Sequence, residues 1–164
     1  MSTGDSDIWV GDLETDGFLE EATVIWCAVF KNLETGRVFS FDIDGGITKL
    51  LPGFLDRVNT VVFHNGICFD VPILKKILGY ELPSHKVLDT LIISRLSHPD
   101  RKVPRGWVGK HLPHSIEAWG MRFGRPKPSH EDWSKYSPEM LHRCREDVEI
   151  TIKTFRSLRE EMSQ

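Results

Sequence analysis

The sequence lacks the features of membrane, secreted and zinc-binding proteins. No apolar run approaches the roughly 20 residues that a helix needs to span a bilayer, and the N-terminus, MSTGDSD, is acidic where a signal peptide is basic and then apolar. Only three cysteines occur, and none belongs to a C-x-x-C pair that would indicate a zinc site. Cys27 and Cys68 follow the large apolar residues Trp26 and Ile67, which predicts buried free thiols. We expect a cytoplasmic protein that does not contact a membrane.

Charge and composition are those of an ordinary globular chain. The 164 residues, of which 40% are hydrophobic and 27% are charged, predict a single domain over 1–164, with its core at about 7–160. A formal net charge of −3 excludes a polycation that binds nucleic acid through charge alone. Nucleic-acid binding would therefore need a local basic segment, or metal ions that offset an acidic site.

The hydrophobic pattern predicts an α/β fold. Strands are expected at 8–14, 22–31, 37–43 and 60–65, and helices at 47–58, 69–80, 88–97, 114–124 and 138–162. Two segments rich in proline and glycine, about 98–113 and 125–136, are predicted to be loops. Three consecutive strands followed by strand–helix alternation predict a mixed central sheet with helices on its faces.

Three carboxylates alternate where the first predicted strand ends. Side chains alternate along a strand, so Asp12, Glu14 and Asp16 point to one face and repel one another. Asp16 precedes Gly17, and this pair is typical of a turn. For Asp12 and Glu14 alone, an exposed strand end and a metal site are equally good interpretations.

Two further acidic residues lie among apolar ones. Asp70 stands between Phe69 and Val71, and Asp147 precedes Val148 on the last predicted helix. A carboxylate that is buried without a basic partner is costly, and a hard divalent cation cancels the charge of several at once. Two such ions held close together are the arrangement used for hydrolysis at phosphorus. The four residues expected to form this metal site are Asp12, Glu14, Asp70 and Asp147.

The order of several motifs resembles a known family. DLET at 12–15, VFHNGICFDVPIL at 62–74 and RCREDVEIT at 143–151 are similar to the three motifs of the DEDD 3′–5′ exonuclease superfamily. LDTLIISRL at 88–96 and SIEAWG at 115–120 extend the similarity to the proofreading domain of phage family A DNA polymerases. D-x-E alone is a weak motif, but the ordered set is specific and spans roughly 7–160 of the chain.

The resemblance implies a ribonuclease-H-like three-layer fold and an enzyme that releases nucleoside 5′-monophosphates from a 3′ end. It implies that two Mg²⁺ or Mn²⁺ ions bind to the four carboxylates, and that single-stranded DNA is the substrate. A separate DNA polymerase is the protein partner that a proofreading subunit would have, and for a phage gene the location is the cytoplasm of the host cell. The residues that the resemblance places against the substrate strand are Leu13, Thr15, Asn65 and Phe69.

One position departs from the family pattern. Members carry either Tyr four residues before the last Asp or His five residues before it, and this chain has Arg143 and His142 at those two positions. On a regular helix, residues four apart differ by about 40° and residues five apart by about 140°. Arg143 would then share the face of Asp147 and contact the scissile phosphate or a carboxylate, and His142 would face away. An irregular first turn would instead let His142 act as general base, and the family's His spacing favours that assignment.

The predicted loop at 98–113 offers a second nucleic-acid contact. Arg101, Lys102, Arg105 and Lys110 surround Trp107, a composition that suits a single strand. A solvated loop anchored by the tryptophan is an equally good interpretation.

Other positions and other functions stay open. Arg125 and Lys127 in the 125–136 loop offer further positive charge, whereas His64 and His130 are isolated and are expected to be structural. An oligoribonuclease-type RNA exonuclease is one alternative function. A nucleic-acid-binding module with impaired catalysis is another, and Arg143 is the feature that favours it.

Overall fold

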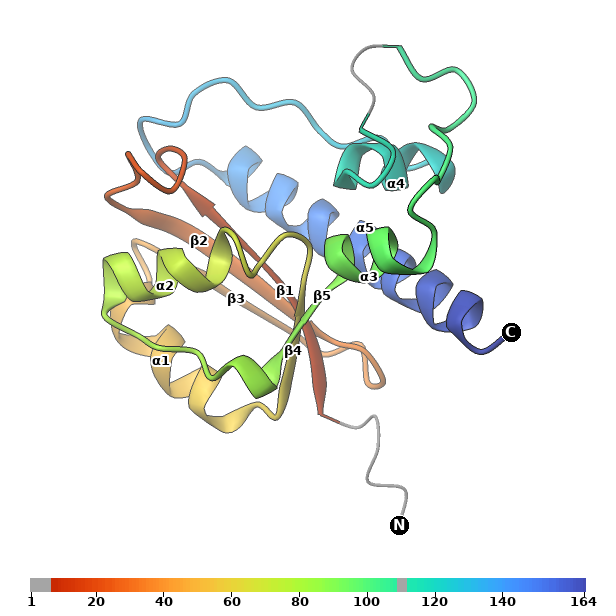
Figure 1. Ribbon diagram of the computed structural model, residues 1–164. Coiled ribbons are helices and arrows are strands. Elements are labelled where there is room, and N and C mark those ends of the chain that lie inside the picture. The colour runs from red at the N-terminus through yellow and green to blue at the C-terminus, as the bar shows by residue number, and fades with distance from the viewer. Residues whose placement is uncertain (1–6, 109–111) are drawn as a thin grey trace.

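A five-stranded mixed sheet forms the centre of the computed structural model, which describes residues 7–108 and 112–164 (Figure 1). Its strands are β1 (Ile8–Thr15), β2 (Ile25–Asn32), β3 (Val38–Asp42), β4 (Thr60–Phe63) and β5 (Val87–Asp89). The strand order is β3-β2-β1-β4-β5. The first three strands form an antiparallel meander, and β4 and β5 run parallel to β1. The expected α/β class with a mixed sheet is confirmed.

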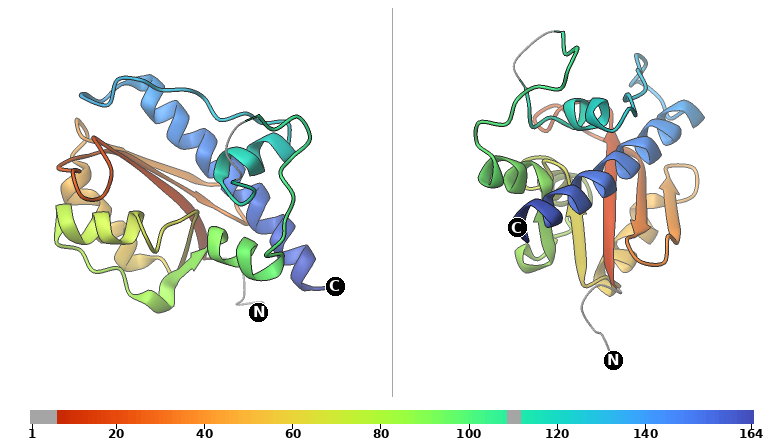
Figure 2. Two further views of the ribbon diagram at one scale, coloured as in Figure 1. Left: turned by 45° about the horizontal axis from the view of Figure 1, so that its top comes forward. Right: turned by 90° about the vertical axis from the view of Figure 1, so that its right-hand side faces the viewer.

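Helices cover both faces of this sheet (Figure 2). On one face lie α1 (Ile47–Arg57) and α2 (Asp70–Leu78), and the long helix α5 (Pro138–Met162) crosses the other. Two short helices, α3 (Thr90–Ser97) and α4 (Ile116–Arg122), pack beside α5. Within 7–108 and 112–164, no helix has the length and apolar content required to cross a membrane.

Side chains alternate along β1, so successive residues face the helices on opposite sides of the sheet. Trp9 and Leu13 belong to the core beneath α1 and α2, whereas Val10 packs in the cluster beneath α5. Asp12 and Glu14 are an even number of residues from Val10, so their side chains point toward α5. Because β1, β4 and β5 are parallel, their carboxyl ends meet at one edge, where open α/β sheets commonly bind ligands.

The predicted helices and strands are present, with shifted ends and one addition. Strand β5 was not expected, because a three-residue strand with an exposed Leu88 is too short to show periodicity. The helix expected from residue 88 therefore begins at Thr90, where Asp89 accepts a hydrogen bond from Leu91 N at 2.9 Å as N-cap. Ser137 caps α5 as the sequence predicts. The expectation for Cys68 is wrong: its thiol is exposed, because it lies in the turn between β4 and α2.

This turn carries part of the site and is held from two sides. Asp89 accepts hydrogen bonds from Asn65 N at 2.9 Å and Ile67 N at 3.0 Å. Asn65 adopts a left-handed conformation (φ 64°), which asparagine tolerates better than most residues. Gly66 packs so tightly that a Cβ there would lie 2.3 Å from Phe63 Cβ. The turn is therefore fixed before any ligand binds.

Gly66→Ala should lower the free energy of unfolding by about 2 kcal/mol, because the added methyl overlaps backbone-proximal atoms that cannot move freely. Urea unfolding of the variant measures this. Gly53→Ala is the matched control, since a Cβ at that exposed position in α1 meets nothing within 4 Å. It should stabilise the protein or leave it unchanged. Equal stability of the two variants would contradict the close packing at Gly66.

Candidate active site

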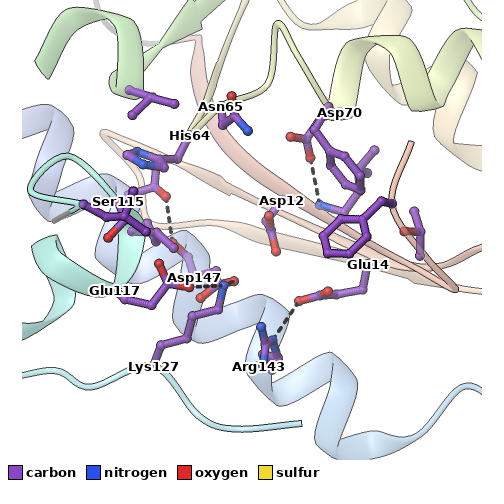
Figure 3. A pocket seen from close by; sticks show the side chains of 18 of the residues that line it. Asp12, Glu14, His64, Asn65, Asp70, Ser115, Glu117, Lys127, Arg143 and Asp147 are labelled. Atoms are coloured by element: carbon purple, nitrogen blue, oxygen red, sulfur yellow. Dashed lines mark hydrogen bonds and ion pairs between the residues drawn. The ribbon is translucent and has the colours of Figure 1, made fainter. Parts of the chain in front are cut away.

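A pocket of about 820 Å³ opens at the carboxyl ends of the parallel strands (Figure 3). Its walls come from β1, the turn after β4, the start of α2, α4, the 125–136 segment and α5. Its volume lies within the usual range for small-ligand sites. The structure brings together nine of the residues expected from the sequence: Asp12, Leu13, Glu14, Thr15, Asn65, Phe69, Asp70, Arg143 and Asp147.

Four carboxylates converge in this pocket from three elements. Asp12 and Glu14 come from β1, Asp70 from the first turn of α2 and Asp147 from α5. Glu14, Asp70 and Asp147 are each less than a tenth exposed. Asp70 Oδ1 accepts a hydrogen bond from Leu13 N at 3.2 Å. In the described parts of the chain, Asp12 Oδ2 and Asp147 Oδ1 are buried without any hydrogen-bond partner.

Burial and mutual repulsion oppose ionisation of these groups. Burial, followed by the charge of Asp147, raises the pKa of Glu14 to about 7, and burial raises the pKa of Asp70 to about 8. Burial and then the charges of its three carboxylate neighbours hold the pKa of Asp12 well above its usual range. Burial also raises the pKa of Asp147. Such shifts are typical of functional sites, because a purely structural core gains nothing from the repulsion.

The structure places His142 outside the pocket, so its role as general base stays a prediction. Helix α5 is regular from Pro138 onward, so His142 lies about 140° from Asp147 around the axis, is exposed and does not line the pocket. Arg143 takes the inward position instead, with its Nε 3.6 Å from Glu14 Oε1. That distance makes an ion pair but is too long for a hydrogen bond.

Arg143 is held in place by two other contacts. Its Nη1 donates to Pro128 O at 3.1 Å, and its guanidinium lies 5.0 Å from the ring centroid of Trp133. Its buried Nε has no hydrogen-bond partner among the residues described. A guanidinium held in this way in the wall of the pocket is suited to bind an anion.

His142→Ala should leave the rate of nucleic-acid hydrolysis within about twofold of the wild type, because the exposed ring makes no contact with the pocket. Arg143→Ala should lower kcat/KM by about 10²-fold, the order of loss expected for a charged donor to a reacting phosphate. Steady-state kinetics of both variants from pH 6 to 9 make the comparison. A large loss in His142→Ala, with a changed pH profile, would restore the general-base assignment.

The side chain that the sequence did not place is Lys127. It lines the pocket as a half-buried side chain, with Nζ 2.9 Å from Asp147 Oδ2 and 3.5 Å from Glu117 Oε1. Burial disfavours its charge, but Asp147 and Glu117 outweigh that effect and raise its pKa. Its only sequence signal is a lysine between two prolines, Pro126 and Pro128, in an otherwise irregular segment.

Two other pocket residues were not expected to contact substrate. His64 Nδ1 lies 2.8 Å from Thr90 Oγ1, which fits the expected structural role, but the ring also lines the pocket. Burial lowers the pKa of His64 to about 4, so the ring is neutral at pH 7. Phe18 stands at the pocket with 81% of its surface exposed.

Among the described residues of the predicted 98–113 loop, Leu112 and Pro113 line the pocket, whereas the basic residues and Trp107 do not. Arg101 pairs with Glu161 at 2.7 Å and stacks on Trp119 at 4.6 Å, so its charge stabilises the fold. Lys102, Arg105 and Trp107 do not line the pocket. Lys110 lies outside the described residues.

Comparisons with known proteins agree with this geometry. No family model matches the chain. The DNA-directed DNA polymerases of Enterobacteria phage T3 and Escherichia phage T7 are each 29% identical to this chain. Each alignment covers 87% of this chain and 25% of the polymerase. Brucella melitensis NrnC with bound Mg²⁺ superposes with a TM-score of 0.67 at 21% identity, covering 99% of this chain and 76% of that one. The Nibbler EXO domain of Aedes aegypti has a TM-score of 0.69 at 11% identity over 96% and 80%.

The chain is thus similar in sequence to phage DNA polymerases and in structure to several proteins of ribonuclease-H-like fold. The structural similarities, all at low identity, establish its ribonuclease-H-like fold. The chain spans about a quarter of the length of the two phage polymerases.

Proposed function

We propose that this protein is a DEDD-type exonuclease that hydrolyses terminal phosphodiester bonds of single-stranded DNA from the 3′ end and releases nucleoside 5′-monophosphates. The observation that carries the proposal is the convergence of four carboxylates, three buried and one, Asp12, half-buried. Asp12 and Asp147 each have a buried oxygen without a partner among the described residues. Leaving such oxygens unpaired is costly unless a ligand satisfies them.

The donor set fits divalent metal ions. All four groups present carboxylate oxygen, the ligand type that Mg²⁺ and Mn²⁺ prefer. We assign Asp12, Glu14, Asp70 and Asp147 as the residues that would hold two such ions. When bound, the ions supply the charge neutralisation and water activation that hydrolysis at phosphorus requires.

The remaining pocket residues support a bound strand end. The guanidinium of Arg143, held by Pro128 and Trp133, would bind an oxygen of the scissile phosphate. Phe18 offers an exposed ring on which an unpaired base can stack. Leu13, Thr15, Asn65 and Phe69 complete the wall along which the terminal nucleotide would lie.

RNA is the alternative substrate, and it has its own support. The sequence relatives are DNA polymerases, which favours DNA, but one structural neighbour is Brucella melitensis NrnC bound to pGG. A module that binds nucleic acid without cleaving it is the third possibility. The assay that separates them uses matched single-stranded DNA and RNA with a 5′ label, incubated with Mg²⁺, Mn²⁺ or EDTA.

The proposal predicts a ladder that shortens from the 3′ end of DNA, stops in EDTA and is faster than on RNA. Faster shortening of RNA than of DNA would mean that the protein is an RNA exonuclease. Binding of either strand without cleavage, in both metals, would leave only the binding module.

A DNA polymerase is the protein partner that we propose, because the sequence relatives are DNA polymerases. A proofreading role predicts that a primer with a mismatched 3′ end is shortened faster than a paired one, since only frayed ends present a single strand. Equal rates on paired and mismatched primers would argue against proofreading.

A further inference from the structure

We propose that Lys127 is a resident counter-ion of the carboxylate cluster and must release Asp147 before a divalent ion can bind there. The inference rests on the metal site proposed above, and it concerns the metal-free state of that site. In that state the positive charge of Lys127 offsets part of the negative charge of the four carboxylates.

The position of the ammonium is the first argument. Lys127 Nζ lies 2.9 Å from Asp147 Oδ2, and its side chain is only 15% exposed (Figure 3). Lysine is rarely buried unless it is paired, so this side chain is in the pocket because of the carboxylates. The other oxygen of Asp147 has no partner in the described ranges, which leaves it available to a second cation.

The backbone around Lys127 is fixed on both sides. Arg125 N donates to Gly120 O at 2.8 Å, and Pro128 O accepts from Arg143 at 3.1 Å. Gly120 allows this approach, because a Cβ there would lie 2.5 Å from Arg125 O. The segment therefore aims Lys127 into the pocket, and only its flexible side chain can move.

A cation and a metal ion cannot share Asp147 without strong repulsion. Like charges at contact distance repel strongly at the effective dielectric near a protein surface. A divalent ion at Asp147 would therefore displace the ammonium, which has Glu117 3.5 Å away as an alternative partner. The displaced ammonium would remain in the pocket, where a substrate phosphate can bind it.

Lys127 thus competes with metal in the absence of substrate, and its removal should tighten metal binding. Mn²⁺ titration followed by electron paramagnetic resonance, without nucleic acid, should give Lys127→Gln at least about a tenfold lower Kd than the wild type. Lys127→Arg keeps the charge and should stay within about threefold of the wild type. Arg125→Gln is the matched control, because it removes a positive charge from the same segment whose partner, Glu146 at 2.7 Å, lies outside the pocket.

Thermal unfolding provides the second measurement. In EDTA, Lys127→Gln should melt at a lower temperature than Arg125→Gln, because its carboxylates have lost their counter-ion, and saturating Mn²⁺ should remove this difference. Lys127 lies in an irregular segment outside the hydrophobic clusters, so we expect the variant to fold. An unchanged or weaker Mn²⁺ affinity in Lys127→Gln would overturn the proposal.

These outcomes are separate from those of the cleavage assay. Tighter Mn²⁺ binding in Lys127→Gln supports the counter-ion role even if no substrate is cleaved. Cleavage by the wild type together with an unchanged Mn²⁺ affinity in the variant overturns only the role of Lys127.

Discussion

Asp12→Asn should lower the rate of hydrolysis by a factor of about 10³ while leaving the metal-free protein folded and, at pH 8, more stable than the wild type. The activity should fall because Asp12 lies at the centre of the proposed metal site, close enough to Glu14, Asp70 and Asp147 for all three charges to raise its pKa. The stability rises because the neutral amide removes one negative charge from a buried cluster. Single-turnover cleavage and urea unfolding in EDTA measure the two effects.

Asp16→Asn is the matched control on the same segment. The Asp16 carboxylate accepts hydrogen bonds from Thr23 N at 2.8 Å and Val24 N at 3.0 Å, so it closes the turn after β1, as the sequence predicts. Its variant should lose stability and keep a rate within a few-fold of the wild type. If Asp12→Asn retained activity, or if both variants lost it equally, the distinction between site and turn would be wrong.

The metal-free protein should lose stability as the pH rises from about 5 to about 8. The pKa of Glu14 in the folded state is about 7 against an ordinary 4.5, and that of Asp70 is about 8 against 3.8. Between these values the folded state binds more protons than the unfolded state, so the free energy of unfolding falls with pH. A loss of several kcal/mol over this range is expected, since each pKa unit of each group corresponds to about 1.4 kcal/mol.

Denaturant unfolding in EDTA at several pH values tests this slope. Glu14→Gln should flatten it, because the amide cannot titrate. Excess Mg²⁺ or Mn²⁺ should reverse it, because the metal binds only the ionised carboxylates, and ligand binding to the folded state adds stability. A stability that is flat or rising with pH in EDTA would mean that the carboxylates are already ionised and compensated without metal.

Local patterns in the sequence were sufficient to predict most of the fold. The alternation of apolar and polar residues predicts β1 and the shared direction of Asp12 and Glu14. The predicted helix over 138–162 matches α5. Strand β5 could not be predicted, because three residues carry no periodicity and pair only through contact with β4. Short elements of this kind are set by tertiary packing.

The site was predictable where it depends on regular geometry. Helix periodicity predicts that Arg143 lies on the pocket side of α5 and His142 on the exposed side, and the structure has this arrangement. The general-base role that the family's spacing favours for His142 stays a prediction. Lys127 could not be placed, because its position depends on how an irregular segment docks on Gly120 and Arg143. The repulsion among the carboxylates is thus already reduced by the protein's own cations before any metal binds.

The most direct test of the central claim is the fate of oxygen from water during cleavage. Single-stranded DNA with a free 3′ end is incubated with the protein and Mg²⁺ in ¹⁸O-water, and the first products are analysed by mass spectrometry. The account predicts nucleoside 5′-monophosphates that carry one ¹⁸O on phosphorus, from the 3′ end only, with no product in EDTA or with Asp12→Asn. Release of 3′-phosphates, cleavage from the 5′ end, or undiminished product from Asp12→Asn would contradict it.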